Sequence, residues 1–163
     1  MIKRNNEKGK RIIAISGGFD PVHVGHIQMI QAAQNYGKVV VIVNSDKWLL
    51  GKKGYIFMPF EERCAIIGAL SGVLNVIGVD DSDGSVCEAL KKIKPNYFGN
   101  GGDRTDKNIP ELDLCKELGV DTVFGLGGAK VQSSSKLVSA SKSKEARDRW
   151  LQMKKWFDTK YDI

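Results

Sequence analysis

Both histidines of this 163-residue chain lie three positions apart, at His23 and His26, in the segment SGGFDPVHVGH. They follow a double glycine, Gly17 and Gly18, at the end of an apolar run. Bare backbone at a helix start presents unpaired N–H groups and a partial positive charge, which suits a phosphate. Two imidazoles at this spacing can donate N–H groups to the same anion. We therefore expect a phosphate-binding loop here; the alternative is a pair of capping or core histidines.

Three further segments of unusual composition point to the same site. They are NSDKWLLGKKG, GNGGDR and GLGGAKVQSSS, and each follows an apolar run, as the histidine segment does. If the runs are parallel strands of one sheet, the segments after them share the edge where such sheets bind ligands. The four segments are therefore expected to converge on one crevice.

The apolar runs alternate with helical patterns in units of about thirty residues, which is typical of parallel βαβ units. The expected strands are Arg11–Ser16, Lys38–Asn44, Asn75–Val79, Asn96–Asn100 and Asp121–Leu126. The expected helices are Val24–Tyr36, Pro59 to a stop at Gly72, Ser85–Ile93, Pro110–Leu118 and Lys144–Phe157, with a loop over Ser45–Met58. This order predicts a Rossmann-like, doubly wound α/β fold, a three-layer sandwich around a five-stranded parallel sheet.

Size and composition are those of one ordinary globular domain, because single domains typically span about 100–200 residues. We expect a domain over residues 1–140 and a helical tail over residues 141–163. The net charge of +6 comes from the ends of the chain: residues 1–11 and 136–163 carry +4 each, which leaves −2 for residues 12–135. Basic ends are more often solvated surface than a binding face, so a nucleic-acid partner is not expected.

The sequence shows no targeting or disulfide signal. No apolar run approaches the ~20 residues of a bilayer-spanning helix, and the basic N-terminus lacks the apolar segment of a secretory leader. The cysteines Cys64, Cys87 and Cys115 have no C-x-x-C spacing, which favours reduced thiols over a disulfide framework or a zinc site. These features predict a cytoplasmic protein without a membrane partner.

The C-terminal region carries two patterns. SSSKLVSASKSK is of low complexity and is interpreted as a flexible linker. In the helix after it, Trp150, Met153 and Phe157 share one face. That face favours a core or dimer contact over a basic amphipathic membrane helix.

GGFDPVHVGH resembles the G-x-F-D-x-x-H-x-G-H signature of the cytidylyltransferase-like (HxGH) nucleotidyltransferase superfamily. The resemblance covers residues 11–138, where VIVNSDKWLLGKKG, PFEERCAIIGAL, KPNYFGNGGDR and VQSSSKLV follow in the order of the family's blocks. It is greatest to the heptose-1-phosphate adenylyltransferase and glycerol-3-phosphate cytidylyltransferase branches. Other motifs fit less well: GLGGAK has Lys130 where a dinucleotide fingerprint needs glycine or alanine, and no P-loop sequence occurs.

The resemblance implies roles for the residues of the histidine segment. His23 and His26 match the pair that contacts the nucleotide phosphates and stabilises the transition state, and Lys52 is expected to act with them as a catalytic residue. Nucleotide contacts are implied for Gly17, Gly18, Phe19, Asp20 and Gly25. For Asp20, a structural role in fixing the loop is an equal alternative to a catalytic one.

The later blocks imply further contacts. Lys53 and Arg63 match residues that reach the triphosphate or the acceptor; a solvated lysine and a salt-bridged arginine are the alternatives. Nucleotide contacts are implied for Asp103, Lys130, Ser133, Ser134 and Ser135, with serine hydroxyls and helix-start amides holding phosphates. Lys130 stands in GGAK, where the family often has an Arg-Thr pair, and it brings a point charge without the planar fork of arginine.

The resemblance implies transfer of a nucleoside monophosphate from CTP or ATP to a small sugar- or polyol-phosphate, with release of pyrophosphate. Mg²⁺ is expected to arrive with the nucleotide, because no carboxylate cluster suggests a metal site of the protein. A homodimer is implied as well. The alternatives are an adenylyltransferase acting on a mononucleotide, an RNA-binding protein and a nucleotide sensor with this fold. The sequence does not decide between CTP and ATP or name the acceptor.

Overall fold

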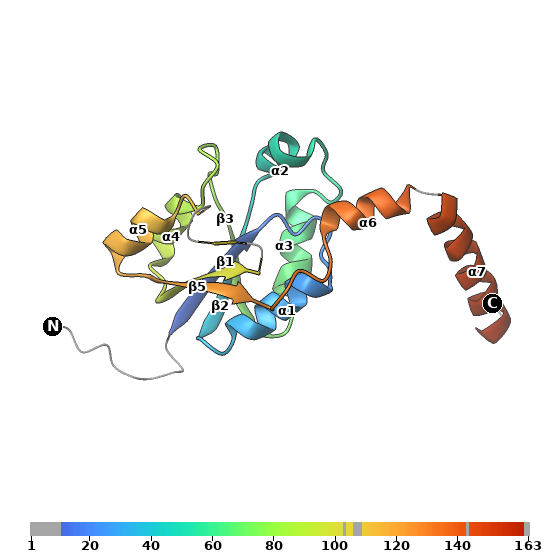
Figure 1. Ribbon diagram of the computed structural model, residues 1–163, viewed down its shortest axis with the longest axis horizontal. Helices are drawn as coiled ribbons and strands as arrows, with labels where there is room; N and C mark the ends of the chain where they lie inside the picture. Colours follow the sequence, from blue (N-terminus) through green and yellow to red (C-terminus); the bar gives the residue numbers. More distant parts are fainter. Residues whose placement is uncertain (1–10, 103, 106–108, 143, 162–163) are drawn as a thin grey trace.

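Five parallel strands form the centre of the protein in a computed structural model that describes residues 11–102, 104–105, 109–142 and 144–161 (Figure 1). The sheet order is β3-β2-β1-β4-β5. The strands are β1 (Ile12–Gly17), β2 (Lys38–Val43), β3 (Val73–Gly78), β4 (Tyr97–Gly101) and β5 (Asp121–Leu126). Each boundary lies within two residues of its prediction, and all pairings are parallel.

Helices cover both faces of this sheet. They are α1 (Val24–Ala33), α2 (Asp46–Lys53), α3 (Phe60–Gly68), α4 (Cys87–Ile93), α5 (Leu112–Leu118), α6 (Ser134–Ser141) and α7 (Lys144–Tyr161). One core cluster contains Met29 of α1 and Ile67 of α3, and the other contains Leu90 of α4 and Cys115 of α5. α1 and α3 therefore pack on one face and α4 and α5 on the other, which confirms the predicted three-layer α/β fold (Figure 1).

The central strands are apolar on both faces because helices cover both. Along β1, Ile13 and Ile15 belong to the cluster under α1 and α3, whereas Ala14 belongs to the cluster under α4 and α5. All three side chains are fully buried. β1 lies between β2 and β4, where the order of the sheet reverses, so the histidine loop that follows β1 starts at the switch point of the sheet.

The expected loop over Ser45–Met58 is wrong for its first half, which forms α2. The Ser45 hydroxyl accepts a hydrogen bond from the Trp48 N–H (3.0 Å) and so caps the first turn. Gly54 ends the helix in the left-handed conformation (φ 76°). The sequence contained both cap signals, but eight residues with a central glycine have no clear helical periodicity.

Two other predictions need correction. The Ser/Lys-rich segment is not a linker, because Ser134–Ser141 forms α6 with Ser133 as its N-cap and buries Val138. The helix that starts after Pro59 ends at Gly68, earlier than Gly72. Gly72 has a left-handed φ of 88° and belongs to the turn before β3.

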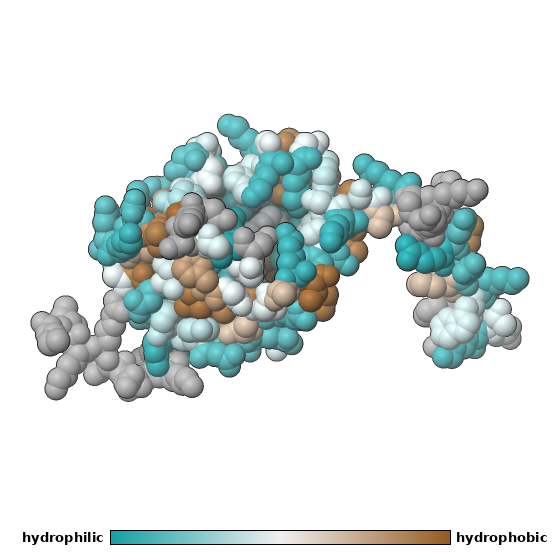
Figure 2. Space-filling view, viewed as in Figure 1, coloured by the Kyte–Doolittle hydropathy of each residue, from teal (hydrophilic) through white to brown (hydrophobic). Residues whose placement is uncertain are grey.

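α7 extends away from the sandwich in Figure 1. Met153 is 62% exposed, so the interpretation of this residue as core is wrong, and a dimer contact stays a prediction. The side chains of Trp150 and Phe157 lie outside the described part of the chain. The face shown in Figure 2 mixes hydrophilic residues with smaller apolar patches, and no described helix is long and apolar enough to cross a bilayer.

Gly99 tests the packing of the sheet. A Cβ on this buried residue of β4 would overlap Leu126 and approach Ile15 to 2.9 Å, so Gly99→Ala should lower the free energy of unfolding by about 1–3 kcal/mol. Urea denaturation measures the change. Gly68→Ala is the matched control, since a Cβ at this exposed end of α3 meets only Val76 at 3.6 Å; equal losses in both variants would contradict the packing.

Candidate functional site

A cavity of about 440 Å³ lies at the carboxyl ends of β1, β4 and β5, beside the N-termini of α1 and α6. We call it the histidine cavity. The predicted site residues that line it are Gly17, Gly18, Phe19, His23, Gly25, His26, Lys52, Lys53, Lys130, Ser133, Ser134 and Ser135. The four segments singled out in the sequence therefore meet, as the order of parallel strands requires.

The two imidazoles form a stacked pair at the start of α1. Their ring centroids are 3.8 Å apart, with 22° between the planes. His23 Nδ1 accepts a hydrogen bond from the Gly25 N–H (3.1 Å), and His26 Nδ1 accepts one from the His23 N–H (3.2 Å). A neutral imidazole that accepts at Nδ1 carries its proton on Nε2. Each ring is therefore held as an Nε2–H donor.

The residues between and beneath the histidines explain their geometry. A Cβ on Gly25 would lie 3.1 Å from the His23 ring, so glycine gives that ring room to fold over the helix start. Phe19 is buried under the pair, with its ring centroid 4.8 Å from that of His26. Phe19 takes a left-handed φ of 51°, which turns the chain sharply after β1. The apolar floor favours uncharged imidazoles above it.

Burial and positive neighbours keep both histidines neutral. Burial, followed by the charges of His23, Lys53 and Lys130, lowers the pKa of His26 to about 3. Burial and the same two lysines also lower the pKa of His23. The pair therefore provides neutral N–H donors at physiological pH. Neither ring has to gain or lose a proton before it can donate to an anion in the cavity.

Cationic side chains surround the imidazoles. Lys52, Lys53, Lys130 and Arg104 all line the cavity, and none of its described lining residues is a carboxylate. Burial is the main cause that lowers the pKa of Lys53; the charge of Asp20 opposes this shift, and neighbouring positive charges add to it. These cations repel one another, and a bound polyanion would offset that repulsion.

The N-terminus of α6 brings the serine segment to the same place. Ser133 caps the helix, its hydroxyl accepting from the Lys136 N–H (3.2 Å), and the Ser134 hydroxyl donates to the Pro21 carbonyl (2.8 Å). The Ser134 hydroxyl thus ties α6 to the histidine loop, a structural use that the family resemblance did not imply. Ser134 and Ser135 of the first turn of α6 line the cavity, and a helix N-terminus at this place is suited to an anion.

The glycines after β4 and β5 let three backbones meet at the other end of the cavity. A Cβ on Gly102 would overlap the carbonyl of Gly128, and a Cβ on Gly127 would lie 2.9 Å from the Met29 nitrogen of α1. Gly127 and Gly128 both have left-handed φ angles, of 81° and 75°. This end of the cavity is therefore a slot walled by bare backbone.

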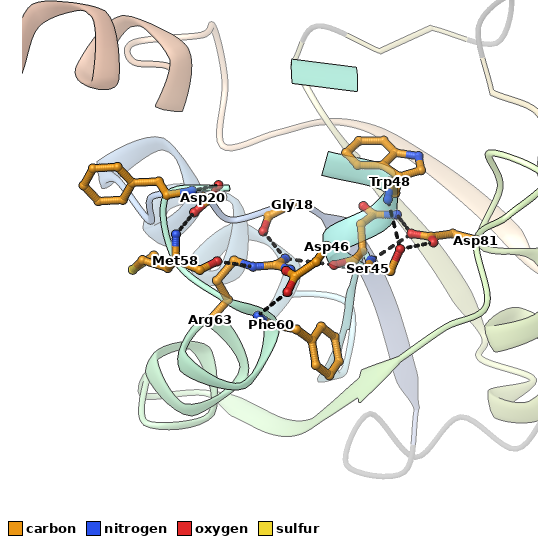
Figure 3. Close-up of polar contacts among 11 residues, drawn as sticks. Gly18, Asp20, Ser45, Asp46, Trp48, Met58, Phe60, Arg63 and Asp81 are labelled. Carbon is orange, nitrogen blue, oxygen red and sulfur yellow. Dashed lines mark hydrogen bonds and ion pairs between the residues drawn. The ribbon is translucent and has the colours of Figure 1, made fainter. Parts of the chain in front are cut away.

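Arg63 does not line the cavity, which corrects its expected contact with the acceptor. Its side chain is fully buried and donates to the carbonyls of Met58 (3.1 Å), Gly18 (2.7 Å) and Asn44 (2.8 Å). It also pairs with the Asp46 carboxylate at 2.6 Å (Figure 3). The guanidinium is thus a clamp between the ends of β1 and β2, the start of α2 and the approach to α3.

Asp20 is likewise buried, and it does not contact the cavity. Its two carboxylate oxygens accept from the Phe57 N–H (2.8 Å) and the Met58 N–H (2.6 Å), and its carbonyl accepts from Lys53 Nζ (3.2 Å). These contacts favour the structural alternative for Asp20. The carboxylate holds the histidine loop against the chain that leads into α3.

Several residues of the site escaped prediction from sequence, among them four with polar or aromatic side chains. Gln28, Trp48, Asn100 and Arg104 line the cavity, and Asp103 lies outside the described residues. Within the described chain, the Gln28 Oε1 and Asn100 Nδ2 atoms are buried without a hydrogen-bond partner. Only their positions in the sequence could have indicated a role in the site: Gln28 lies one turn into α1, and Asn100 lies at the end of β4. Residues at strand ends tend to face ligands.

Comparison with known proteins identifies the family of the chain. The sequence model of the cytidylyltransferase-like family matches residues 14–146. The bifunctional protein HldE of Sulfurimonas denitrificans is 33% identical over 135 residues, which are 80% of this chain and 28% of the relative. The bifunctional protein HldE of Gluconobacter oxydans is 32% identical over 151 residues, 88% of this chain and 30% of the relative. The chain thus spans less than a third of these relatives.

A solved structure agrees on the fold. The lipopolysaccharide core biosynthesis protein from Thermoplasma volcanium GSS1 superposes with a TM-score of 0.60 at 23% identity. The match covers 75% of this chain and 98% of that protein. The family resemblance drawn from the histidine segment is confirmed by the match over residues 14–146.

The clamp can be tested through stability. Arg63→Met would remove the donor that pairs with Asp46 Oδ1 and with three carbonyls, and we expect the free energy of unfolding to fall by about 3–5 kcal/mol in urea denaturation. The control is Lys91→Met, which removes an exposed ion pair with Glu88 and should cost about 0–1 kcal/mol. A loss at Arg63 no larger than at Lys91 would contradict the clamp.

The neutral state of the histidines can be tested by NMR, since the chain has only two. Long-range ¹H–¹⁵N spectra should show Nε2–H tautomers, and the His26 signals should stay constant from about pH 8 to about pH 5. The pKa of His26 is near 6.5 in the unfolded chain and about 3 in the folded chain. The free energy of unfolding should therefore decrease as the pH falls from about 6.5 toward 3. His26→Asn should reduce that decrease. A His26 midpoint near pH 6.5 would contradict the burial effect.

Proposed function

Because the chain belongs to the cytidylyltransferase-like family, we propose that it transfers a nucleoside monophosphate from ATP or CTP to a small phosphorylated acceptor. The observation that carries this proposal is the histidine cavity itself. Two imidazole Nε2–H donors, four cationic side chains and two helix N-termini surround one space. Such a set of donors fits a triphosphate better than any uncharged ligand.

The proposed reaction needs no activated side-chain nucleophile. An oxygen of the acceptor phosphate forms a bond to the α-phosphorus, and the bond from that phosphorus to its bridging oxygen breaks. Pyrophosphate leaves with the electron pair. The phosphate oxygen is already ionised at neutral pH, so the protein's contribution is to align the two phosphates and to stabilise the charge that builds on the leaving group.

His23 and His26 are proposed to provide that stabilisation. Their Nδ1 atoms are occupied by backbone donors, so their tautomers and orientations are set before a ligand arrives. Lys52, Lys53 and Lys130 line the same space and add positive charge. Preorganised donors of this kind need little rearrangement in the transition state.

The nucleoside is proposed to lie in the glycine-walled slot between the ends of β4 and β5. Backbone that approaches closely without Cβ atoms suits a flat base and its ribose. Asn100, which is 4% exposed, and Gln28 place amide groups at this cavity. Their unpartnered atoms, within the described chain, give a ligand both a donor and an acceptor to satisfy.

Mg²⁺ is proposed to enter with the nucleotide. Mg²⁺ prefers oxygen ligands, and the described lining of the histidine cavity offers imidazoles, ammonium groups and amides rather than carboxylates. These residues by themselves do not fit a metal site. The oxygens that hold the ion would then be those of the triphosphate.

A pair of variants at His26 tests the proposal. Asparagine can keep an acceptor for the His23 N–H but removes the Nε2–H donor, whereas glutamine can keep a donor near Nε2. We expect His26→Asn to lower the rate of pyrophosphate release about 10²–10³-fold, the usual effect of losing one transition-state donor, and His26→Gln to lower it less.

The measurement is pyrophosphate release from ATP and from CTP with a panel of phosphorylated acceptors. Circular dichroism and thermal unfolding of both variants control for the fold. Wild-type turnover by His26→Asn would remove the histidine from the mechanism. Nucleotide binding without turnover for every acceptor would favour a sensor over an enzyme.

A further inference from the structure

Arg104 lines the histidine cavity from the loop that follows β4, and it is the one arginine among the described lining residues. Its backbone N–H donates to the Gly101 carbonyl (3.2 Å), so a tight turn at the end of the strand holds the backbone from which the side chain extends. The residue is half-buried. The guanidinium therefore belongs to the wall of the cavity.

Arg104 and Lys130 occupy matching positions on two loops that touch. β4 and β5 are neighbours in the sheet, and just beyond them a Cβ on Gly102 would overlap the carbonyl of Gly128. Arg104 is two residues past Gly102, and Lys130 is two residues past Gly128. Both residues line the histidine cavity. The two cations therefore reach the cavity from adjacent loops at the same edge of the sheet.

The loop after β5 leads from Lys130 to the N-terminus of α6. Ser133 is the N-cap of this helix, and it lines the cavity together with Ser134 of the first turn. A helix N-terminus is suited to phosphate oxygens. Arg104, Lys130 and this helix end thus gather positive charge in one part of the cavity, and a phosphate group there would offset their repulsion.

The guanidinium of Arg104 has no hydrogen-bond or ion-pair partner among the described residues. Arg63 is the opposite case, because three carbonyls and the Asp46 carboxylate satisfy its guanidinium. The described lining of the cavity contains no carboxylate that could pair with Arg104. A half-buried guanidinium without a protein partner is available to an anionic ligand.

Arginine differs in geometry from the lysines of the cavity. Its planar guanidinium presents N–H groups as a fork that can bind two phosphate oxygens at once, whereas a lysine ammonium is a point charge. Most of the charge of a nucleoside triphosphate is on its β- and γ-phosphates, and more develops there as pyrophosphate leaves. A fork at this place would therefore bind the leaving group more tightly in the transition state than in the bound substrate.

We propose that Arg104 binds the β- and γ-phosphates of the nucleotide and stabilises the departing pyrophosphate, with Lys130 beside it. This inference rests on the proposed nucleotide transfer and adds a catalytic residue to it. The guanidinium stays protonated throughout, so it contributes charge and hydrogen bonds and exchanges no proton with the reactants.

Variants of Arg104 test the role in turnover. Arg104→Gln removes the charge and the fork, and we expect kcat/KM for pyrophosphate release to fall about 10²-fold. Arg104→Lys keeps the charge without the fork and should stay about tenfold below wild type. The matched control is Arg149→Gln, the same change at an exposed arginine of α7 that does not line the cavity, which should leave kcat/KM unchanged.

Calorimetric titration tests the role in phosphate binding. In Arg104→Gln the affinity for inorganic pyrophosphate, and for ATP or CTP, should fall about tenfold, while the affinity for AMP or CMP stays the same. Because the two loops touch, Lys130→Arg added to Arg104→Gln can return a guanidinium to the same part of the cavity. The double variant should recover about tenfold of the lost turnover.

Thermal unfolding separates this role from a structural one. Since the guanidinium has no partner in the described protein, Arg104→Gln should unfold at the wild-type midpoint. A lower midpoint assigns the arginine to the fold and overturns the inference.

The remaining outcomes separate the two proposals. Wild-type turnover by Arg104→Gln, or a double variant no faster than Arg104→Gln, overturns the inference and leaves nucleotide transfer in place. Equal losses of affinity for ATP and AMP, or for CTP and CMP, assign Arg104 to the nucleoside and overturn it as well. If the wild-type protein releases no pyrophosphate with any acceptor, the proposed function fails, and the affinities for pyrophosphate and AMP still decide whether Arg104 binds phosphates.

Discussion

The buried guanidinium of Arg63 is the interaction on which the arrangement of the site depends. A charge without access to water costs several kcal/mol unless hydrogen bonds and an opposite charge compensate it. Here three carbonyls and the Asp46 carboxylate do so, and they belong to the loop after β1, the end of β2, the start of α2 and the approach to α3. Moving any of these segments would deprive the buried guanidinium of one of its partners, so the histidine loop and the lysine-bearing helix keep one relative position.

Two carboxylates complete this frame, and neither is at the surface of the histidine cavity. Asp20 accepts two backbone N–H groups from the chain before α3, and Asp81 joins the ends of β2 and β3 to α2. Because these two carboxylates are hydrogen-bonded beneath the site, the described lining of the cavity contains cationic and neutral residues but no carboxylate. Burial and, after it, the positive neighbours lower the pKa of both histidines, and the same positive charges favour a polyanion as the ligand.

Much of this could be predicted from local sequence signals. The alternation of apolar runs and helical patterns predicted the strands within two residues, because buried parallel strands are continuous in their apolar character. α2 and α6 were missed, since both are eight residues long and polar, and their caps at Ser45 and Ser133 are weaker signals than periodicity. Arg63 was misassigned for a related reason: a helix arginine in a polar segment has the same sequence pattern whether it is buried or exposed.

By itself, the sequence determined the fold class, the meeting of four segments at one sheet edge and the family, because each depends on the order and composition of segments. Only the tertiary structure decided which charged residues face the ligand. Burial and hydrogen-bond partners, which come from segments far apart in the chain, withdraw Arg63 and Asp20 into the frame and leave Lys52, Lys53 and Lys130 at the cavity. The same long-range packing brings Arg104 and Lys130 to one cavity from loops that touch, an arrangement that no spacing in the sequence encodes.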